Sequence, residues 1–111
     1  MGNTFIGEFE QMVLLAVLRQ GHSAYAIGVR EELERSAGRS VSRGALYRTF
    51  DRLEAKGYLE WEMESGGPVP ERGGHPMRRF RVTEAGVEAL QASRTALINL
   101  WSGLEGVLDK P

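Results

Sequence analysis

The hydrophobic period of this chain changes once, after Gly57, and that change restricts the possible folds more than any other feature. Before Gly57, apolar side chains recur every three to four residues, which indicates helices. After Gly57, apolar and charged side chains alternate, which indicates strands with one buried face. The alternating apolar residues are Leu59, Trp61 and Met63 in a first run and Phe80 and Val82 in a second. The sequence therefore predicts helices followed by a hairpin whose strands are joined by a long loop rich in glycine and proline.

Glycine and serine residues mark where helices end and begin in the first part of the chain. The spacing predicts three helices, over about residues 8–20, 24–36 and 43–56. Ser23 and Ser42 each stand where the side chain can cap the following helix by accepting a hydrogen bond from a free backbone amide. The first helix is apolar on every side at its centre, residues 12–18, so it requires cover on all sides. In a chain of 111 residues, we expect a second subunit to supply part of that cover.

A last helix is expected over about residues 84–108, capped by Thr83. At ~1.5 Å per residue it would be about 40 Å long, more than so small a domain can cover. Apolar residues recur along it at spacings of three and four, with Arg94 as a polar interruption. These residues are Val87, Leu90, Leu97, Trp101, Leu104 and Leu108. Such a heptad seam predicts a homodimer, with Met12 and Leu15 of the first helix contributing, and the alternative is a seam that packs on its own domain.

Three helices followed by a hairpin is the element order of a winged helix-turn-helix. In that fold the third helix enters the major groove of DNA, and the loop between the strands flanks it. We therefore expect a mainly α fold with a small β part, a winged helix-turn-helix with a C-terminal dimerisation helix. Residues 1–83 would form the winged-helix DNA-binding domain, and residues 84–111 would form the dimerisation helix of the same continuous fold.

The third helix has one apolar and one polar side, as a helix in the major groove requires. Leu46, Phe50 and Leu53 form the apolar stripe that faces the core. Arginines on the polar side can bind a phosphate or the O6/N7 edge of guanine with a planar fork, and the free amides of a helix start favour a phosphate. The candidate DNA-binding residues are Ser42, Arg43, Gly44, Tyr47, Arg48 and Arg52 on this helix, and Arg72, His75 and Arg78 in or beside the loop.

Structural roles compete with DNA contacts at some of the polar positions. The hydroxyl of Tyr47 could donate to a phosphate, or its ring could cap the edge of the core. Arg79 and Arg81 alternate with the apolar residues of the second strand, so this pair of arginines can face the acidic pair Glu60 and Glu62 across the hairpin. We expect these residues to form ordinary cross-strand ion pairs.

Charge is nearly balanced overall but unevenly distributed. The chain has 14 basic and 15 acidic residues and a formal net charge of −1. Five basic residues fall between Arg39 and Lys56, and four arginines without an acid fall between Arg72 and Arg81. Such segregation can steer a polyanion to one face, and solvated faces with local ion pairs would explain it equally well. The rival function is a winged-helix protein–protein interaction module without DNA binding, which would explain the near-zero net charge.

Several segments together resemble the PadR-type transcriptional regulators. They are GEFE at residues 7–10, running into Leu14 and Leu15, AYAI at 24–27, SRGALY at 42–47, RLEAKG at 52–57 and RRFRVTEAG at 78–86. The resemblance implies a winged-helix dimer on double-stranded DNA, joined chiefly by the C-terminal helix with help from the first, as in the short subgroup with a single C-terminal helix. It also implies a repressor and a response to a small aromatic effector, as in several family members.

The chain departs from the family pattern at two positions. Many members have proline after the Leu-Tyr pair, where this chain has Arg48, which we expect to add a DNA contact. Some relatives use a tryptophan of the last helix as a stacking surface for a drug at the dimer interface, and Trp101 stands about one turn later. Leu97 and Trp101 are the candidate ligand residues, with Trp101 as a core residue of the dimer interface as the alternative.

Catalytic chemistry finds little support in the sequence. The histidines, His22 and His75, are far apart and lack a metal-ligand spacing, and the chain has no cysteine. The glycine-rich loop lacks the Gly-Lys-Ser/Thr ending of a phosphate-binding loop. The longest apolar run, residues 12–18, is far shorter than a ~20-residue membrane span, and no signal peptide is recognisable. We expect a cytoplasmic protein that is not an enzyme and has no metal, cofactor or membrane segment.

Overall fold

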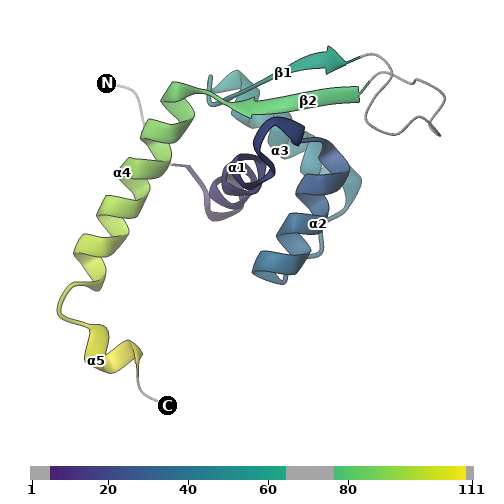
Figure 1. The fold of residues 1–111 in the computed structure, drawn as a ribbon. Helices are drawn as coiled ribbons and strands as arrows, with labels where there is room; N and C mark the ends of the chain where they lie inside the picture. Colours follow the sequence, from purple (N-terminus) through teal and green to yellow (C-terminus); the bar gives the residue numbers. More distant parts are fainter. Residues whose placement is uncertain (1–5, 65–76, 110–111) are drawn as a thin grey trace.

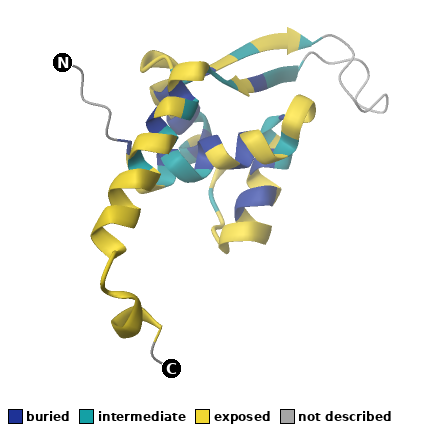
Figure 2. Ribbon diagram, turned by 60° about the vertical axis from the view of Figure 1, so that its left-hand side comes forward, coloured by how far each residue is buried: buried dark blue, intermediate teal, exposed yellow. Residues whose placement is uncertain are grey.

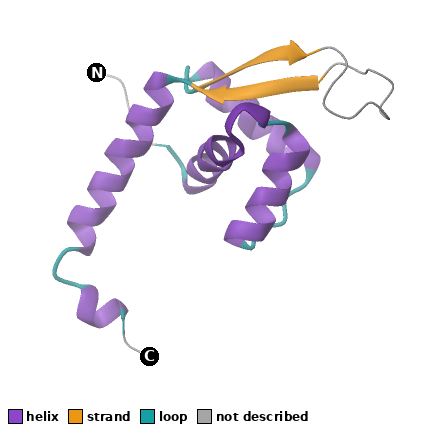
Figure 3. Ribbon diagram, viewed as in Figure 1, coloured by secondary structure: helices purple, strands orange, loops and turns teal. Residues whose placement is uncertain are grey.

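The computed structural model of the chain describes residues 6–64 and 77–109, and the order of its elements is the predicted one. The helices are α1 (Glu8–Gln20), α2 (Ala26–Ala37), α3 (Arg43–Ala55), α4 (Glu84–Trp101) and α5 (Glu105–Leu108), with a short 3₁₀ turn, η1 (Gly21–Ser23), after α1. The strands are β1 (Leu59–Glu64) and β2 (Met77–Val82). Helices α1, α2 and α3 form the body, and the hairpin lies across one side of it (Figures 1 and 3).

The core lies where α1, α2, α3 and the hairpin meet. Leu46, Phe50 and Leu53 of α3 are buried, as the apolar stripe predicts. Phe50 stacks on Phe80 of β2, with ring centroids 4.0 Å apart, and this contact fixes the hairpin against α3. Ser42 caps α3 as expected, because its Oγ accepts a hydrogen bond of 3.1 Å from the amide of Ala45.

The start of α2 differs from the prediction. Ser23 does not cap this helix but ends the 3₁₀ turn, and α2 begins at Ala26 without a side-chain cap. The amide of Phe80 in β2 donates a 2.8 Å hydrogen bond to the carbonyl of Ala24, whose backbone is extended. Because Ala24 is held beside β2 in this way, the chain turns into a helix only after Tyr25.

The hairpin is antiparallel and has the predicted cross-strand ion pairs. Its register places Glu60 opposite Arg81 and Glu62 opposite Arg79, and both pairs are in ion-pair contact. These four side chains share the outer face of the hairpin, away from the α3 core. The prediction of structural roles for Arg79 and Arg81 is therefore confirmed.

The last helix is shorter than predicted. Thr83 caps α4 as expected, but the continuous helix over residues 84–108 is wrong, because α4 ends at Trp101 and α5 is a separate turn of helix. Gly103 lies between them with φ of +86°, in the left-handed region that glycine reaches without steric cost. The Ser-Gly pair at 102–103 therefore breaks the seam into two helices.

Most of α4 projects away from the body (Figures 1 and 2). Gly86 and Ala89 of its first turns are buried, and a Cβ at Gly86 would lie 2.4 Å from the carbonyl oxygen of Tyr58, so only glycine fits there. Beyond Leu90 the helix extends past the core, and its apolar side chains are exposed. The exposed apolar residues of α4, of α5 and of the segment between them are Leu97, Ile98, Leu100, Trp101, Leu104, Val107 and Leu108.

Helix α1 is covered on one side only. Val13, Leu14 and Val17 are buried, whereas Leu15 is 48% exposed and Leu18 is 45% exposed. None of the helices described is long and apolar enough to cross a membrane. In residues 6–64 and 77–109, no group of three or more histidine, cysteine or acidic residues is placed to hold a metal ion.

Candidate nucleic-acid interface

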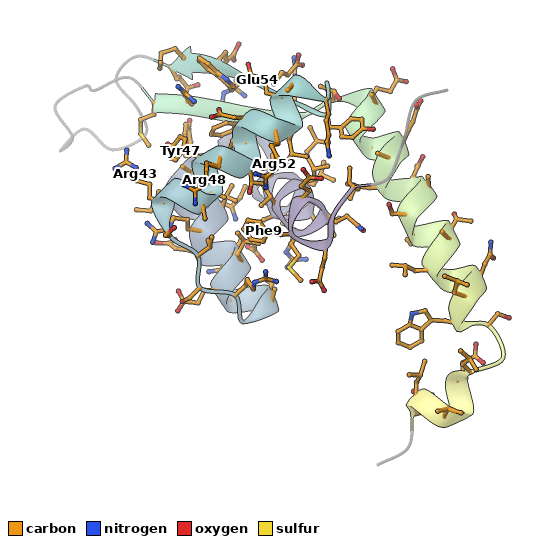
Figure 4. The ribbon with its side chains drawn as sticks, turned by 180° about the vertical axis from the view of Figure 1, so that it is seen from behind. Phe9, Arg43, Tyr47, Arg48, Arg52 and Glu54 are labelled. Atoms are coloured by element: carbon orange, nitrogen blue, oxygen red, sulfur yellow. The ribbon has the colours of Figure 1, made fainter. Side chains whose placement is uncertain are left out.

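The exposed face of α3 carries the candidate residues along its length (Figure 4). Ser42 stands at the start of the helix, and Arg43, Gly44 and Arg48 are exposed on its N-terminal half. In the part of the chain that the structure describes, neither Arg43 nor Arg48 has a carboxylate oxygen within 4.0 Å. Two guanidinium groups therefore stand near the amides of a helix N-terminus without a carboxylate partner among the described residues, an arrangement that attracts phosphate.

The C-terminal half of α3 is held by a buried carboxylate that is not among the residues predicted from the sequence. Glu10 of α1 is 7% exposed and accepts hydrogen bonds from Lys56 Nζ at 2.9 Å and from Arg52 Nε at 3.3 Å. Burial raises the pKa of Glu10, but the hydrogen bonds from Lys56, from the amide of Gly7 and from Arg52 outweigh it, so the pKa lies below its usual value. The available sequence signal was helical spacing, because Glu10 stands three and seven residues before Val13 and Val17, on the face of α1 that is buried.

Arg52 thus has a structural partner as well as a predicted DNA contact. Its Nη2 donates to the hydroxyl of Thr49 at 3.1 Å, and its Nε donates to Glu10. The Arg52 side chain is still 54% exposed, so part of its guanidinium faces solvent. The DNA contact of Arg52 stays a prediction, with fewer free donors than Arg43 or Arg48.

Tyr47 packs at the edge of the core. Its ring meets the ring of Phe50 edge-on, with centroids 5.4 Å apart and planes at 89°. The guanidinium carbons of Arg43 and Arg78 lie 5.6 Å and 5.8 Å from its centroid, within the range of cation–π attraction. The ring therefore has the structural role, and the hydrogen bond from its hydroxyl to a phosphate stays a prediction.

The candidate residues of the hairpin fall in two groups. Arg72 and His75 lie outside the described residues. Arg78 is half-buried on β2, with its guanidinium carbon 4.4 Å from the centroid of the Trp61 ring. Trp61 in turn donates a hydrogen bond of 3.2 Å from Nε1 to Glu54 of α3. The sequence pattern places Arg78 beside the loop and indicates for Trp61 only a place in the alternation of the first strand.

Arg19 and Arg35, on the other side of the body, share a buried carboxylate as their partner. Glu32 of α2 is buried and accepts hydrogen bonds from Ser36, from Arg35 at 2.6 Å and from Arg19 at 2.8 Å. Together these bonds lower the pKa of Glu32 from 4.5 to about 2. Local ion pairs, the alternative explanation of the charge pattern, therefore describe Arg19 and Arg35 but not the arginines at the start of α3.

The predicted dimer and ligand residues lie along α1, α4 and α5. Val87 and Leu90 are half-buried, and Leu90 packs against the core, so packing on the same domain accounts only for the start of the seam. Leu97 and Trp101, one turn apart on α4, are 49% and 50% exposed. Met12 and Leu15 of α1 line an apolar hollow of about 200 Å³ between α1 and α2.

Comparisons with known proteins agree on fold and family. A PadR-like transcription factor from Bacteroides fragilis is 23% identical over 89% of this chain and 88% of that chain, with a TM-score of 0.69. A PadR family transcriptional regulator from Eggerthella lenta is 24% identical over 94% of this chain and 88% of that chain, with a TM-score of 0.67. These likenesses confirm the predicted winged helix-turn-helix, and no curated protein matches the chain.

A family model describes the same region of the molecule. The model of the transcriptional regulator PadR-like family matches residues 14–92, from the middle of α1 through the hairpin to the first turns of α4. The match includes all of α3 and both strands, and it spans well over half of the chain. The chain therefore belongs to the PadR-like family of transcriptional regulators, a family that is not enzymatic.

Proposed function

We propose that this regulator represses transcription by binding, as a homodimer, to a pseudo-palindromic operator. The observation that carries the proposal is the pair of exposed arginines on the N-terminal half of α3, which have no carboxylate partner within the described residues. PadR-like regulators bind DNA, and α3 is the helix that a winged helix-turn-helix inserts into the major groove.

The DNA-binding residues have distinct proposed roles. Ser42 and Gly44 bring the start of α3 close to the backbone, where the free amides favour a phosphate. Arg43 and Arg48 bind phosphate or the O6/N7 edge of guanine, and Arg52 adds a weaker contact from its exposed edge. In the hairpin, Arg72, His75 and Arg78 bind the backbone or the adjacent minor groove.

The homodimer is supported by apolar surface that a single chain leaves exposed. Leu15 and Leu18 on α1, together with the exposed apolar side chains from Leu97 to Leu108, are between 45% and 72% exposed. A symmetric pair of chains would cover both surfaces, through Met12, Leu15, Val87, Leu90, Leu97, Trp101, Leu104 and Leu108. It would also present two copies of α3 to one face of a duplex, about 34 Å or a multiple apart.

Selection from a random library of DNA duplexes, combined with sedimentation, tests this proposal. We expect the recovered duplexes to share two inverted half-sites about 10 base pairs apart, or a multiple of that spacing, and the protein to sediment as a dimer at micromolar concentration. Recovery of unrelated sequences, or of one unpaired half-site, would contradict the proposal. Weak DNA binding that hardly depends on salt would favour the protein–protein interaction module instead.

Effector release is a separate part of the proposal. A flat aromatic compound that stacks on Trp101 beside Leu97 would alter the angle between the two α4 helices and so the spacing of the two α3 helices. Titration with planar aromatic compounds should quench tryptophan fluorescence and release the selected duplex together. The quenching should be lost in Trp101→Phe. Quenching without a change in DNA affinity would exclude the effector role.

A further inference from the structure

The inner face of the hairpin is apolar except for a single arginine. The register places three pairs of residues on this face, namely Leu59 with Val82, Trp61 with Phe80, and Met63 with Arg78. On the outer face, Arg79 and Arg81 are paired with glutamates. Neighbouring arginines of one strand therefore have different surroundings, and Arg78 is the one that faces α3.

Arg78 differs from the other arginines of β2 in its partners. Arg78 is half-buried and has no carboxylate oxygen within 4.0 Å among residues 6–64 and 77–109. Partial burial of an unpaired cation has a desolvation cost, and an apolar residue would continue the face without that cost. What Arg78 has instead are two aromatic faces, those of Trp61 at 4.4 Å and Tyr47 at 5.8 Å from its guanidinium carbon.

Trp61 is itself held in place from α3. Its Nε1 donates to Glu54 at 3.2 Å, and the Arg78 guanidinium lies over the face of its ring. The centroid of the second ring, that of Tyr47, also lies 5.6 Å from the guanidinium carbon of Arg43. The two rings thus connect the inner face of the hairpin with the N-terminal half of α3, where the free arginines stand.

We infer that Trp61 is a positioning residue for DNA binding, which together with Tyr47 holds the guanidinium of Arg78 beside the start of α3. From there the fork of Arg78 binds a backbone phosphate of the duplex that α3 enters. The stacking orders a long side chain before DNA arrives, so less rotamer entropy is lost on binding. The inference rests on the proposed function, because it assigns a role within the same DNA-binding surface.

A matched pair of variants on β2 tests whether Arg78 contacts DNA. Arg78→Ala and Arg81→Ala each remove one positive charge from the same strand, but Arg81 lies on the outer face and is paired with Glu60. With the selected duplex, we expect Arg78→Ala to weaken binding about tenfold and Arg81→Ala to change it by less than about twofold. Equal reductions in affinity in the two variants would show general electrostatics and would overturn the inference.

A double-mutant cycle tests the role of Trp61. Trp61→Leu removes the aromatic face and should weaken DNA binding about fivefold, whereas Trp61→Phe keeps a flat ring and should retain most of the affinity. In the Arg78→Ala background, Trp61→Leu should weaken binding no further. Urea unfolding of each variant checks that the folded fraction is the same in every binding experiment.

The outcomes separate this inference from the proposed function. Should Trp61→Leu weaken binding equally with and without Arg78, or Trp61→Phe behave like Trp61→Leu, Trp61 does not act through Arg78. Should Arg43→Ala and Arg48→Ala abolish binding while Arg78→Ala has no effect, the proposed function stands and the role of Arg78 fails. A wild-type protein that selects no DNA sequence would remove both.

Discussion

The two halves of α3 carry the same kinds of side chain in opposite electrostatic surroundings. At the C-terminal end, Arg52 and Lys56 both donate to the buried carboxylate of Glu10, which belongs to α1. At the N-terminal end, Arg43 and Arg48 are exposed, and the described residues place no carboxylate within ion-pair distance of either. One end of the helix is tied to the body, and the other remains free for a ligand.

The difference shows how one helix can serve both the fold and binding. Removing any member of a buried carboxylate bonded to two cations lowers stability, because the groups left behind lose their hydrogen bonds. An exposed cation without a partner contributes little to folding, since water solvates it in the folded and unfolded states alike. Anchoring at one end also fixes the direction in which the free end of α3 points.

The largest effect is expected from removing both free arginines. The double variant Arg43→Ala/Arg48→Ala should have about 100-fold lower affinity for the selected duplex, because each substitution removes a guanidinium that binds phosphate or guanine. The free energy of unfolding should change by less than about 0.5 kcal/mol, since neither side chain is buried. Fluorescence anisotropy of labelled duplex and urea unfolding measure the two quantities. A large decrease in stability with unchanged affinity would reverse the assignment of the two ends.

Removing Glu10, which anchors the C-terminal end of α3, should affect stability rather than DNA affinity. Glu10→Ala leaves Arg52 and Lys56 without their shared partner and should lower the free energy of unfolding by about 2 kcal/mol, allowing for the half-exposed cations. Glu34→Ala is the matched control, because Glu34 is an exposed acid on α2. We expect the control to change stability by less than about 0.5 kcal/mol. Equal stability of the two variants would show that Glu10 does not anchor α3.

Arg52 should show both effects, each at smaller size. Arg52→Ala removes one of the two cations bound to Glu10, so it should cost about 1 kcal/mol of unfolding free energy. Its DNA affinity should fall about threefold, less than for Arg48→Ala, because two of its nitrogens already have protein acceptors. A decrease in affinity as large as that of Arg48→Ala would place Arg52 with the free arginines.

Acid should remove the stability that the ion-paired carboxylates of Glu10 and Glu32 contribute. The N-terminal end of α3, where Arg43 and Arg48 have no carboxylate partner among the described residues, should not change. The folded-state pKa of Glu32 is about 2 and that of Glu10 is also below 4.5, so both acids contribute stability that is complete above pH 4.5. That contribution is lost as the pH falls from 4.5 toward 2 for Glu32, because the unfolded state then binds the proton more readily. Urea unfolding at several pH values should show a smaller acid-induced decrease in stability in Glu32→Gln than in the wild type. Parallel pH profiles would exclude this role of Glu32.

Local features of the fold were predictable because short segments determine them. The change of period after Gly57 predicted the hairpin, and the hydroxyls of Ser42 and Thr83 predicted two helix starts that the structure confirms. Ser23 failed as a cap because a hydrogen bond from the distant Phe80 holds Ala24 extended. Such a hydrogen bond joins residues far apart in the chain and leaves no local pattern.

The same limit applies to the candidate site. The exposed arginines of α3 follow from helical spacing, but the hydrogen bond between Glu10 and Arg52 joins residues 42 positions apart. The inward direction of Arg78 depends on β2 beginning at Met77, within a stretch where the alternation was not recognised. The break at Gly103 was visible as a Ser-Gly pair, but the apolar spacing on either side of it favoured a continuous helix.

The salt dependence of DNA binding tests the division of α3 most directly. The slope of the logarithm of the binding constant against the logarithm of salt concentration changes by about 0.9 for each phosphate that the protein no longer neutralises. For the selected duplex, we predict a slope shallower by about 2 in Arg43→Ala/Arg48→Ala and an unchanged slope in Arg79→Ala/Arg81→Ala, which removes as many charges from ion pairs. Equal slopes in both double variants would contradict the claim that the free end of α3 is the DNA-binding surface.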